Sequence, residues 1–309
     1  MKTILVTGGA GNIGSALANR LSENKDNYIV IIDNLTTGNL SKIPKASNVK
    51  FIKADVNNYH DIVPVFGRHN FDFVFHYAAV VGVKRTLEKP MNVLEDIEGI
   101  KNILSLSKNS GVKRVFYSSS SEVYGEPFEF PQNEKTTPLN SRLPYAIVKN
   151  VGESFFKSYY QEYGLEYTIF RFFNTYGPNQ SEDFVIPRFL NLALKNDPIA
   201  IYGDGLQTRS FCYVDDNVDT CIKAVESGIC LNDVLNVGSD IEITILSLAK
   251  TIILLTKSKS KIIHLPPLEE GDMTRRCPDT TKMKKVLGRD LISLESGLKK
   301  LISYYESRK

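Results

Sequence analysis

Short runs of β-branched and aromatic residues alternate with longer stretches of helical periodicity along the first half of the chain. Ile13, Leu17 and Leu21 recur at a spacing of four, and segments 93–106 and 145–160 repeat apolar residues with a similar period, which predicts amphipathic helices. One of the apolar runs has almost no polar position, as in a strand covered on both faces. The runs predict strands at 3–7, 28–32, 49–52, 71–75, 112–117 and 167–172.

Strands that alternate with helices predict the α/β class, with a Rossmann-type, doubly wound parallel sheet and helices on both of its faces. The pattern then loosens, because prolines and glycines interrupt it, and further helices are expected near 246–255 and 294–305. We therefore expect a sheet domain over residues 1–174, to which the chain returns at about 209–240. Residues 175–309 would mainly form a smaller α/β lobe that binds the substrate.

The charges of the chain nearly cancel, since 38 Lys and Arg face 35 Asp and Glu in 309 residues. A net charge of +3 excludes a dedicated polyanion binder, whose basic excess is usually clear, so no nucleic-acid partner is expected. A hydrophobic fraction of 42% is enough for a large core. The apolar runs are too short to cross a membrane, so no membrane partner is expected either.

The cysteines all lie in the last third of the chain, as Cys212, Cys221, Cys230 and Cys277. They form no Cys-x-x-Cys pair, and no histidine stands at zinc-ligand spacing beside one, so no metal site is expected. At this length and density the thiols are expected to be reduced, which suits a cytoplasmic protein.

A glycine-rich turn follows the first predicted strand and reads Gly8-Gly-Ala-Gly-Asn-Ile-Gly14. Its glycines let the backbone turn tightly and approach a pyrophosphate, which then sits at the N-terminus of the next helix. Asp33 ends the second predicted strand, about 20 residues further on. Its carboxylate could accept hydrogen bonds from both ribose hydroxyls and would repel a 2′-phosphate, which favours NAD over NADP. Asp55, after the third strand, is a candidate contact for the adenine edge or only a turn residue.

Tyr145 and Lys149 stand four residues apart on a predicted helix that follows a Pro144 break, so both side chains emerge on one face. A nearby ammonium and a positive nicotinamide would stabilise a phenolate and lower the pKa of Tyr145 from its usual value of about 10. Such a tyrosine could take the proton of a sugar hydroxyl while a hydride leaves the same carbon. The serine run 118–121 follows a predicted strand, where α/β sheets bind ligands. One of these serines could hydrogen-bond the same hydroxyl, or the run could simply cap the strand.

Together these motifs resemble the extended short-chain dehydrogenase/reductases, and within them the nucleotide-sugar epimerase/dehydratase group, over nearly all of the chain. The resemblance implies NAD as the cofactor, a nucleotide-diphosphate sugar as the substrate, and a homodimer formed through a helix pair that includes 145–160. The segments that carry it are Thr7-Gly-Gly-Ala-Gly-Asn-Ile-Gly14, Asp33-Asn34, His76-Tyr-Ala-Ala79, Ser118-Ser-Ser-Ser-Glu-Val-Tyr-Gly125, the Tyr145/Lys149 pair, Arg171-Phe-Phe-Asn-Thr-Tyr-Gly-Pro178 and Tyr202-Gly-Asp-Gly205.

The resemblance also implies roles for single residues. Tyr145 would be the catalytic base, Lys149 would hold the nicotinamide ribose, and Ser120 would stand beside the reacting hydroxyl. Glu122 completes the expected catalytic set, and arginines among the substrate residues would face the diphosphate. Cofactor contacts are expected from Gly8, Gly11, Asn12, Ile13, Gly14, Asp33, Asn34, Asp55, Val56, Ala78, Ala79, Tyr145 and Lys149. Substrate contacts are expected from Val81, Lys84, Ser121, Asn174, Arg209, Arg275 and Arg276.

The resemblance favours a UDP-sugar 4-epimerase. In this family NAD first oxidises C4 of the sugar, and an epimerase then returns the hydride to the other face of the rotated keto sugar. The segments 80–85 and Tyr145-Ala-Ile-Val-Lys149 resemble those of epimerases. Ser121 stands where the 4,6-dehydratases carry the acid of an Asp-Glu pair, which disfavours dehydration.

A UDP-glucuronate decarboxylase is the main alternative, because Glu122 and the stretches 202–216 and 275–279 also resemble that group. Against it, residues 145–150 lack the Asp-Glu-Gly-Lys-Arg that usually follows the catalytic tyrosine there. Further alternatives are another keto-sugar chemistry, a non-enzymatic NAD sensor, which the Tyr/Lys pair opposes, and an NADPH-dependent keto-sugar reductase, which Asp33 opposes. Asp96 departs from the family, which commonly has Asn there, so the hydrogen bonding around it is expected to be rearranged.

Overall fold

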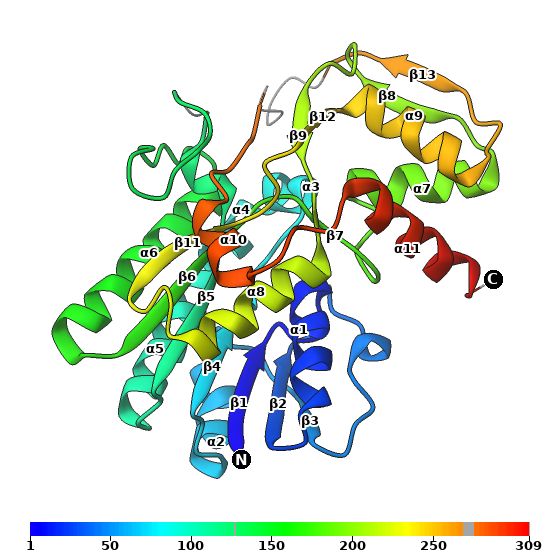
Figure 1. Ribbon diagram of the computed structural model, residues 1–309. Helices are drawn as coiled ribbons and strands as arrows, with labels where there is room; N and C mark the ends of the chain where they lie inside the picture. Colours follow the sequence, from blue (N-terminus) through cyan, green and yellow to red (C-terminus); the bar gives the residue numbers. More distant parts are fainter. Residues whose placement is uncertain (127, 268–274, 309) are drawn as a thin grey trace.

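Seven parallel strands form one sheet, in the spatial order β11-β6-β5-β4-β1-β2-β3 (Figure 1). The computed structural model describes residues 1–126, 128–267 and 275–308. The strands of the sheet are β1 (Lys2–Thr7), β2 (Asn27–Asp33), β3 (Val49–Lys53), β4 (Phe73–His76), β5 (Arg114–Ser120), β6 (Glu166–Phe172) and β11 (Asp233–Val237). This arrangement confirms the expected α/β class and the Rossmann-type parallel sheet.

The first strands of the sheet coincide with the predicted ones to within a few residues, whereas β11 is not among them. It pairs in parallel with β6, with Val234 opposite Ile169. Asp233 and Asn236 interrupt its apolar pattern, so five residues alone give too weak a signal for a strand.

Both faces of the sheet are apolar, because successive residues of a strand point to opposite sides. In β1, Ile4 and Val6 join one buried cluster and Leu5 joins the other. Side chains of α1 (Asn12–Glu23) and α8 (Val214–Ser227) belong to the first cluster. Side chains of α2 (Tyr59–Arg68), α5 (Asp96–Asn109) and α6 (Pro144–Tyr163) belong to the second. The sheet is therefore wound on both faces, as its sequence pattern predicts.

Most of the remaining elements lie beyond the carboxyl ends of the strands, whereas α10 (Thr281–Leu287) packs against α8 and β11 (Figure 1). The remaining elements include the two-stranded sheets β8–β13, β9–β12 and β7–β10. Their strands are β7 (Thr175–Tyr176), β8 (Ile199–Tyr202), β9 (Thr208–Ser210), β10 (Cys212–Tyr213), β12 (Glu242–Thr244) and β13 (Ile262–Leu265). The other helices are α3 (Val83–Glu88), α4 (Pro90–Leu94), α7 (Val185–Lys195), α9 (Ile245–Thr256), α10 (Thr281–Leu287), α11 (Leu294–Glu306) and the short 3-10 helices η1 (Leu40–Lys42) and η2 (Ser121–Tyr124). None of the helices described here is long and apolar enough to span a membrane.

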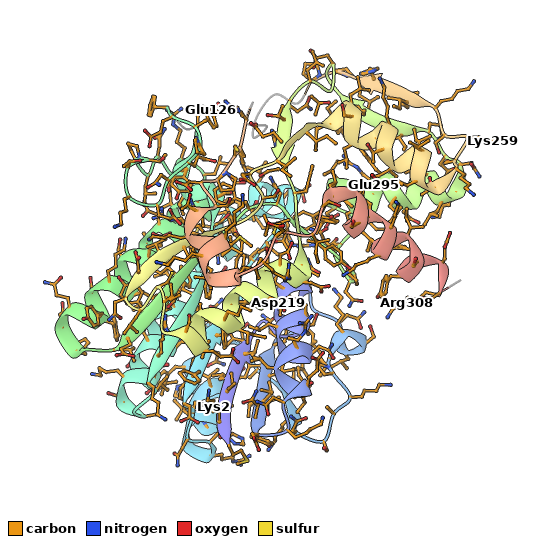
Figure 2. The ribbon with its side chains drawn as sticks, in the orientation of Figure 1. Lys2, Glu126, Asp219, Lys259, Glu295 and Arg308 are labelled. Atoms are coloured by element: carbon orange, nitrogen blue, oxygen red, sulfur yellow. The ribbon has the colours of Figure 1, made fainter. Side chains whose placement is uncertain are left out.

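Ion pairs tie α1 and α8 to the C-terminal part of the chain. Asp219, labelled on α8 in Figure 2, accepts from Arg20 of α1 at 2.6 Å and from Arg289 at 2.7 Å. Arg289 also contacts the buried carboxylate of Asp216 at 2.5 Å. Three segments that are distant in the sequence are thus held on one face of the sheet.

Close contact between α6 and β5 depends on a glycine. A Cβ atom added at Gly152 would overlap the hydroxyl and ring of Tyr117, which is fully buried in β5. Glycine is a poor helix former, so this position trades helix propensity for a short distance between helix and sheet. The absence of a side chain at Gly152 therefore allows α6 to pack closely against β5.

We expect Gly152→Ala to lower the free energy of unfolding by about 1–3 kcal/mol, because the added methyl group overpacks the contact with Tyr117. Urea denaturation at one fixed NAD concentration measures the change. Gly67→Ala is the matched control, since a Cβ at this position of α2 meets open space. The control should be neutral or gain up to about 1 kcal/mol, and equal losses in the two variants would contradict the explanation.

Candidate active site

The predicted site residues meet at the carboxyl ends of the central strands. The glycine turn follows β1, the Ala78–Ala79 turn follows β4, the serine run ends β5, and Tyr145 lies in the first turn of α6. Open parallel sheets bind ligands at this edge. In Figure 2 this edge lies on the side of Glu126, and Lys2 marks the opposite ends of the strands.

The glycine turn is built for close approach. Gly8 has a φ of +68°, and a Cβ there would lie 2.7 Å from the backbone nitrogen of Ala78. A Cβ at Gly14 would overlap the Gly8 carbonyl oxygen. Gly11 caps α1 without a side chain, so the first amide groups of this helix face outward, and the buried Oδ1 of Asn12 has no hydrogen-bond partner among the described residues. An anion such as the pyrophosphate of NAD fits this backbone cradle at a helix N-terminus.

Asp33 organises the adjoining turns and retains capacity for a ligand. Its Oδ2 accepts from the Ala10 amide at 3.0 Å, and its Oδ1 accepts from the Leu35 amide at 2.8 Å. Each carboxylate oxygen can accept a second hydrogen bond, as the ribose hydroxyls of NAD would require. Asn34 donates to Oδ2 of Asp55 at 3.0 Å, which links the ends of β2 and β3.

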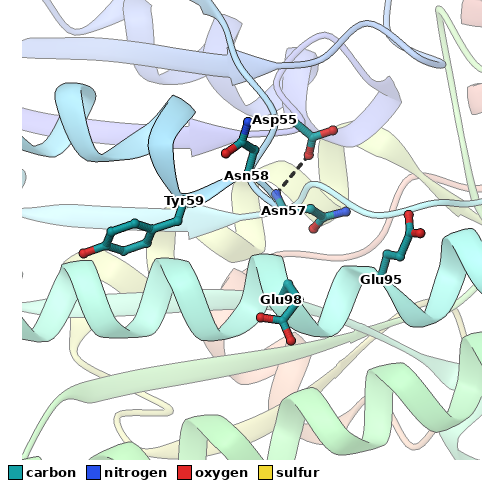
Figure 3. A pocket seen from close by; sticks show the side chains of 6 residues that line it. All are labelled: Asp55, Asn57, Asn58, Tyr59, Glu95 and Glu98. Atoms are coloured by element: carbon teal, nitrogen blue, oxygen red, sulfur yellow. Dashed lines mark hydrogen bonds between the residues drawn. The ribbon is translucent and has the colours of Figure 1, made fainter.

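Asp55 and the buried Val56 stand beside a pocket of about 410 Å³ between the start of α2 and the start of α5 (Figure 3). Asp55 Oδ1 accepts from the Asn57 amide at 2.9 Å. The pocket is lined by Asp55, Asn57, Asn58, Tyr59, Glu95 and Glu98. The adenine contact expected of Asp55 and Val56 stays a prediction.

Thr7 fixes the turn after β4. Its hydroxyl oxygen accepts from the amides of Tyr77 at 3.1 Å and Ala78 at 3.2 Å, so its proton is left to donate to Nδ1 of His76 at 2.9 Å. Burial, with a smaller effect of the Lys149 charge, lowers the pKa of His76 to about 3, so the ring is neutral. The half-buried Ala78 and Ala79 are thereby held against the glycine turn.

Tyr145, Lys149 and Ser120 come together as expected from the sequence. Ser120 donates a hydrogen bond to the Tyr145 oxygen, and Lys149 Nζ lies 5.7 Å from the Tyr145 ring centre. Lys149 donates to the Ser118 carbonyl at 2.7 Å. Ser120 reaches Tyr145 because β5 ends directly opposite the first turn of α6.

The pKa of Tyr145, the residue expected to act as the base, shifts in the opposite direction from the one predicted from the sequence. Burial raises the pKa of Tyr145 above its usual value, although the hydrogen bond from Ser120 and the charge of Arg276 act against this. Burial lowers the pKa of Lys149 to about 8, and the Asp96 carboxylate partly offsets this. The expected lowering for Tyr145 is therefore wrong for the protein residues alone, because desolvation outweighs their favourable contacts.

Arg275 and Arg276, predicted as neighbouring diphosphate ligands, diverge. Arg276 is buried and forms an ion pair of 2.7 Å with Glu122. Arg275 is exposed, pairs with Glu242 at 2.6 Å and stacks on the Phe130 ring at 4.3 Å. Adjacent residues of an extended segment point in opposite directions, so the two guanidinium groups lie on opposite sides of the segment.

The other predicted substrate residues lie around the same edge. Arg209 is buried in β9 and donates to the Thr208 carbonyl at 2.7 Å. Asn174 donates to the Ser210 carbonyl at 3.0 Å, which places it beside that strand. Ser121 is buried in η2, and Val81 is exposed between β4 and α3. The side chain of Lys84 lies outside the described residues, and the substrate contacts of all these residues stay predictions.

A buried ion pair beneath the catalytic groups was missed by sequence reasoning. Glu153 accepts from Arg171 at 2.7 and 2.8 Å and from the Ser119 hydroxyl at 2.7 Å. Arg171 also donates to the Tyr124 hydroxyl at 2.8 Å. Glu153 stands four residues after Lys149 on the same helix, a spacing that could have indicated it.

The fold and the glycine cradle are those of a dinucleotide-binding protein, and the comparisons with known proteins narrow the class of enzyme. The model of the NAD dependent epimerase/dehydratase family matches residues 4–238, so the chain belongs to this family and NAD is its cofactor.

Two curated proteins are each 36% identical over 98% of both chains. They are a UDP-N-acetyl-alpha-D-glucosaminuronate decarboxylase of Bacillus cytotoxicus and a putative UDP-glucose 4-epimerase of Methanocaldococcus jannaschii. A crystal structure of UDP-glucose 4-epimerase with UDP-glucose from Thermotoga maritima superposes with a TM-score of 0.93, at 33% identity over 99% of both chains. The protein is therefore an NAD-dependent enzyme that modifies nucleotide sugars.

Proposed function

We propose that the protein is a 4-epimerase of UDP sugars. The observation that carries this proposal is the pairing of Glu122 with Arg276, 2.7 Å apart next to the catalytic tyrosine. Glu122 is the carboxylate beside Tyr145 whose position matches that of an acid/base group at the sugar ring, and its Oε1 is already engaged by the Arg276 guanidinium. Ser121 supplies no acid beside it. What the site offers is thus proton transfer by Tyr145, which is sufficient for reversible oxidation and reduction at C4.

In this reaction the residues of the chain handle one proton. Tyr145 takes the C4 hydroxyl proton as phenolate, while Ser120 orients the same oxygen by hydrogen bonding. The Lys149 ammonium stabilises the phenolate electrostatically. Bound NAD supplies the acceptor for the C4 hydride and later its donor. The keto sugar then rotates in the site so that its other face meets the cofactor. Tyr145 returns its proton to the C4 oxygen, and the product differs from the substrate only in the configuration at C4.

The UDP portion would be held at the edge formed by β9 and its neighbours. Arg209 and Asn174 lie there, and a buried guanidinium is suited to bind phosphate oxygens in a bidentate manner. The Thermotoga maritima epimerase was crystallised with UDP-glucose, which supports a UDP sugar for this chain as well.

A decarboxylase is the second candidate, because the Arg276 cation could bind the carboxylate of a sugar acid. Arg276 is a buried cation beside the base, and a carboxylate on C5 of a sugar could replace Glu122 as its partner. Oxidation at C4 would then weaken the bond to the carboxylate carbon. That bond breaks, carbon dioxide leaves, and its electron pair forms an enolate that takes up a proton at C5. The relative from Bacillus cytotoxicus is a decarboxylase of this kind by name.

We expect Tyr145→Phe to lower kcat for C4 epimerisation by about 100-fold or more, because the proton acceptor is lost. NMR of a mixture with UDP-glucose or UDP-N-acetylglucosamine follows the appearance of the C4 epimer. NAD should remain bound, since the cradle at Gly8 is unchanged. Tyr160→Phe, an exposed tyrosine on the same helix, is the matched control and should retain full activity. Near-normal turnover in Tyr145→Phe would refute the assigned base.

Glu122→Gln separates the two candidate reactions. An epimerase should lose less than about tenfold in kcat, because glutamine still accepts a hydrogen bond from Arg276. A decarboxylase should lose 100-fold or more, a typical contribution of a general acid or base. The assay uses UDP-glucose, UDP-N-acetylglucosamine and UDP-glucuronate with the wild-type protein and the variant. A C4 epimer identifies an epimerase, whereas a pentose with carbon dioxide identifies a decarboxylase and refutes our proposal.

A second copy of the chain is the partner that we propose for α6. The solvent side of this helix carries a groove of about 390 Å³ whose lining includes Val151, Phe155 and Tyr159. The helix α4, which contacts α6, carries the exposed Met91. A contiguous apolar patch of this kind marks an association surface.

All four cysteines are free and buried, which suits an enzyme of the reducing cytoplasm.

We expect the wild-type protein to sediment as a homodimer and Phe155→Glu to sediment as a monomer, because a charge would be buried in the helix pair. Analytical ultracentrifugation distinguishes the two masses. Leu254→Glu is the control, since Leu254 is exposed on α9, away from α6. A monomeric wild type, or an unchanged dimer in Phe155→Glu, would refute this interface.

A further inference from the structure

Asp96 is a buried carboxylate that the proposed proton transfer does not use. It is the first residue of α5, where the helix dipole favours a negative charge. Its Oδ2 accepts from the Val80 amide at 2.7 Å, and its Oδ1 accepts from the Asn57 side-chain amide at 3.4 Å. The side chain is thus fixed between the turn that follows β4 and the turn that follows β3.

The charge of Asp96 acts on both members of the catalytic pair. Lys149 is buried, and its ammonium donates to the carbonyl and the hydroxyl of Ser118, which are neutral groups. The Asp96 carboxylate favours the protonated form of Lys149, against the effect of burial on its pKa. It also adds to the effect of burial in raising the pKa of Tyr145. A negative charge stabilises the protonated state of every neighbour, whether that neighbour is a base or an acid.

Other ionisable groups lie around Tyr145, Lys149, Asp96 and the neighbouring Tyr117 of β5. They are His76 of β4, Glu122 of η2, Glu153 of α6, Asp55 after β3 and Arg276 of the C-terminal segment.

Most of these groups add no net charge near Tyr145 and Lys149, because they are either paired with an opposite charge or neutral. Glu122 and Glu153 are each paired with an arginine. His76 and Tyr117 are neutral, since burial lowers the pKa of the first to about 3 and raises that of the second. Burial raises the pKa of Asp96, whereas the charge of Lys149 acts against this. Asp96, like Asp55, has no ion-pair partner within 4 Å among the residues that the structure describes. Its net charge is therefore available to Lys149.

We propose that Asp96 is a positioning residue for the C4 oxidation, whose buried negative charge keeps Lys149 protonated while its hydrogen bond fixes the Val80 turn. The proposal rests on the assigned roles of Tyr145 and Lys149, and it applies to the epimerase and the decarboxylase alike. A positive nicotinamide disfavours a second cation nearby, so a carboxylate opposite Lys149 counters that repulsion.

Asp96→Asn removes the charge and keeps an oxygen that can accept the Val80 amide. In the NAD-loaded protein we expect the pKa of Lys149 to fall by about one unit. NMR titration of lysines labelled at the side-chain carbon measures it, with the Lys149 signal assigned by its absence from Lys149→Arg. The optimum of kcat should also move to lower pH, because both groups of the coupled pair lose a stabiliser of their protonated states. NAD affinity should change by less than about twofold.

Two further variants separate charge from hydrogen bonding. Asp96→Ala removes both, so it should show the same fall in the Lys149 pKa and, in addition, weaker NAD binding by isothermal titration. Glu23→Gln removes an exposed carboxylate at the last residue of α1, away from the carboxyl ends of the strands, and should change neither quantity.

An unchanged Lys149 pKa in Asp96→Asn would overturn the proposal. So would an equal fall in Glu23→Gln, which would make the effect one of net charge. The titration needs no substrate, so it decides the role of Asp96 even if none of the tested sugars is converted. Absence of sugar turnover would instead count against the proposed function.

Discussion

The buried ion pair between Glu153 and Arg171 is the interaction on which the catalytic geometry depends. Each charge would be costly to bury alone, and each is satisfied by the other through two hydrogen bonds. Ser119 and Tyr124 add further hydrogen bonds, so the pair joins α6, β6, β5 and η2. These elements carry Tyr145, Ser120 and Glu122, to which the proposed mechanism assigns the proton transfer and its surroundings. Loss of either partner would leave a charge unpaired in the core, and the relative positions of all three groups would change with it.

The cofactor side of the site is fixed by backbone contacts rather than charges. The Gly8 backbone touches Ala78 too closely for any side chain, and the hydroxyl of Thr7 binds the amides of the same turn. Asp96 then accepts a hydrogen bond from the amide of Val80, two residues beyond Ala78. The cradle for NAD and the catalytic pair are thus joined through one short segment, because the strands that bear them are neighbours in the sheet.

Local patterns predicted much of the fold and the core of the site. The glycine turn, Asp33 and the Tyr145/Lys149 spacing are contained within short segments, and their context of strand and helix is visible in the sequence. The divergence of Arg275 and Arg276 was not predictable, because Glu242 and Glu122, which draw them apart, are distant in the sequence. The short strand β11 was not predicted, because polar residues break its apolar pattern and its pairing with β6 is non-local. The raised pKa of Tyr145 depends on burial, which residue spacing does not reveal.

The choice between epimerisation and decarboxylation depends on which anion pairs with Arg276. Its guanidinium is 8% exposed, so solvent cannot replace a partner, and Glu122 provides one. A neutral sugar leaves this pair intact and adds only a hydroxyl for Tyr145. A sugar acid brings a second carboxylate to one guanidinium, so that either Glu122 must move or two like charges must share it. The intact pair therefore matches a neutral sugar better, which is the physical reason to place epimerisation before decarboxylation.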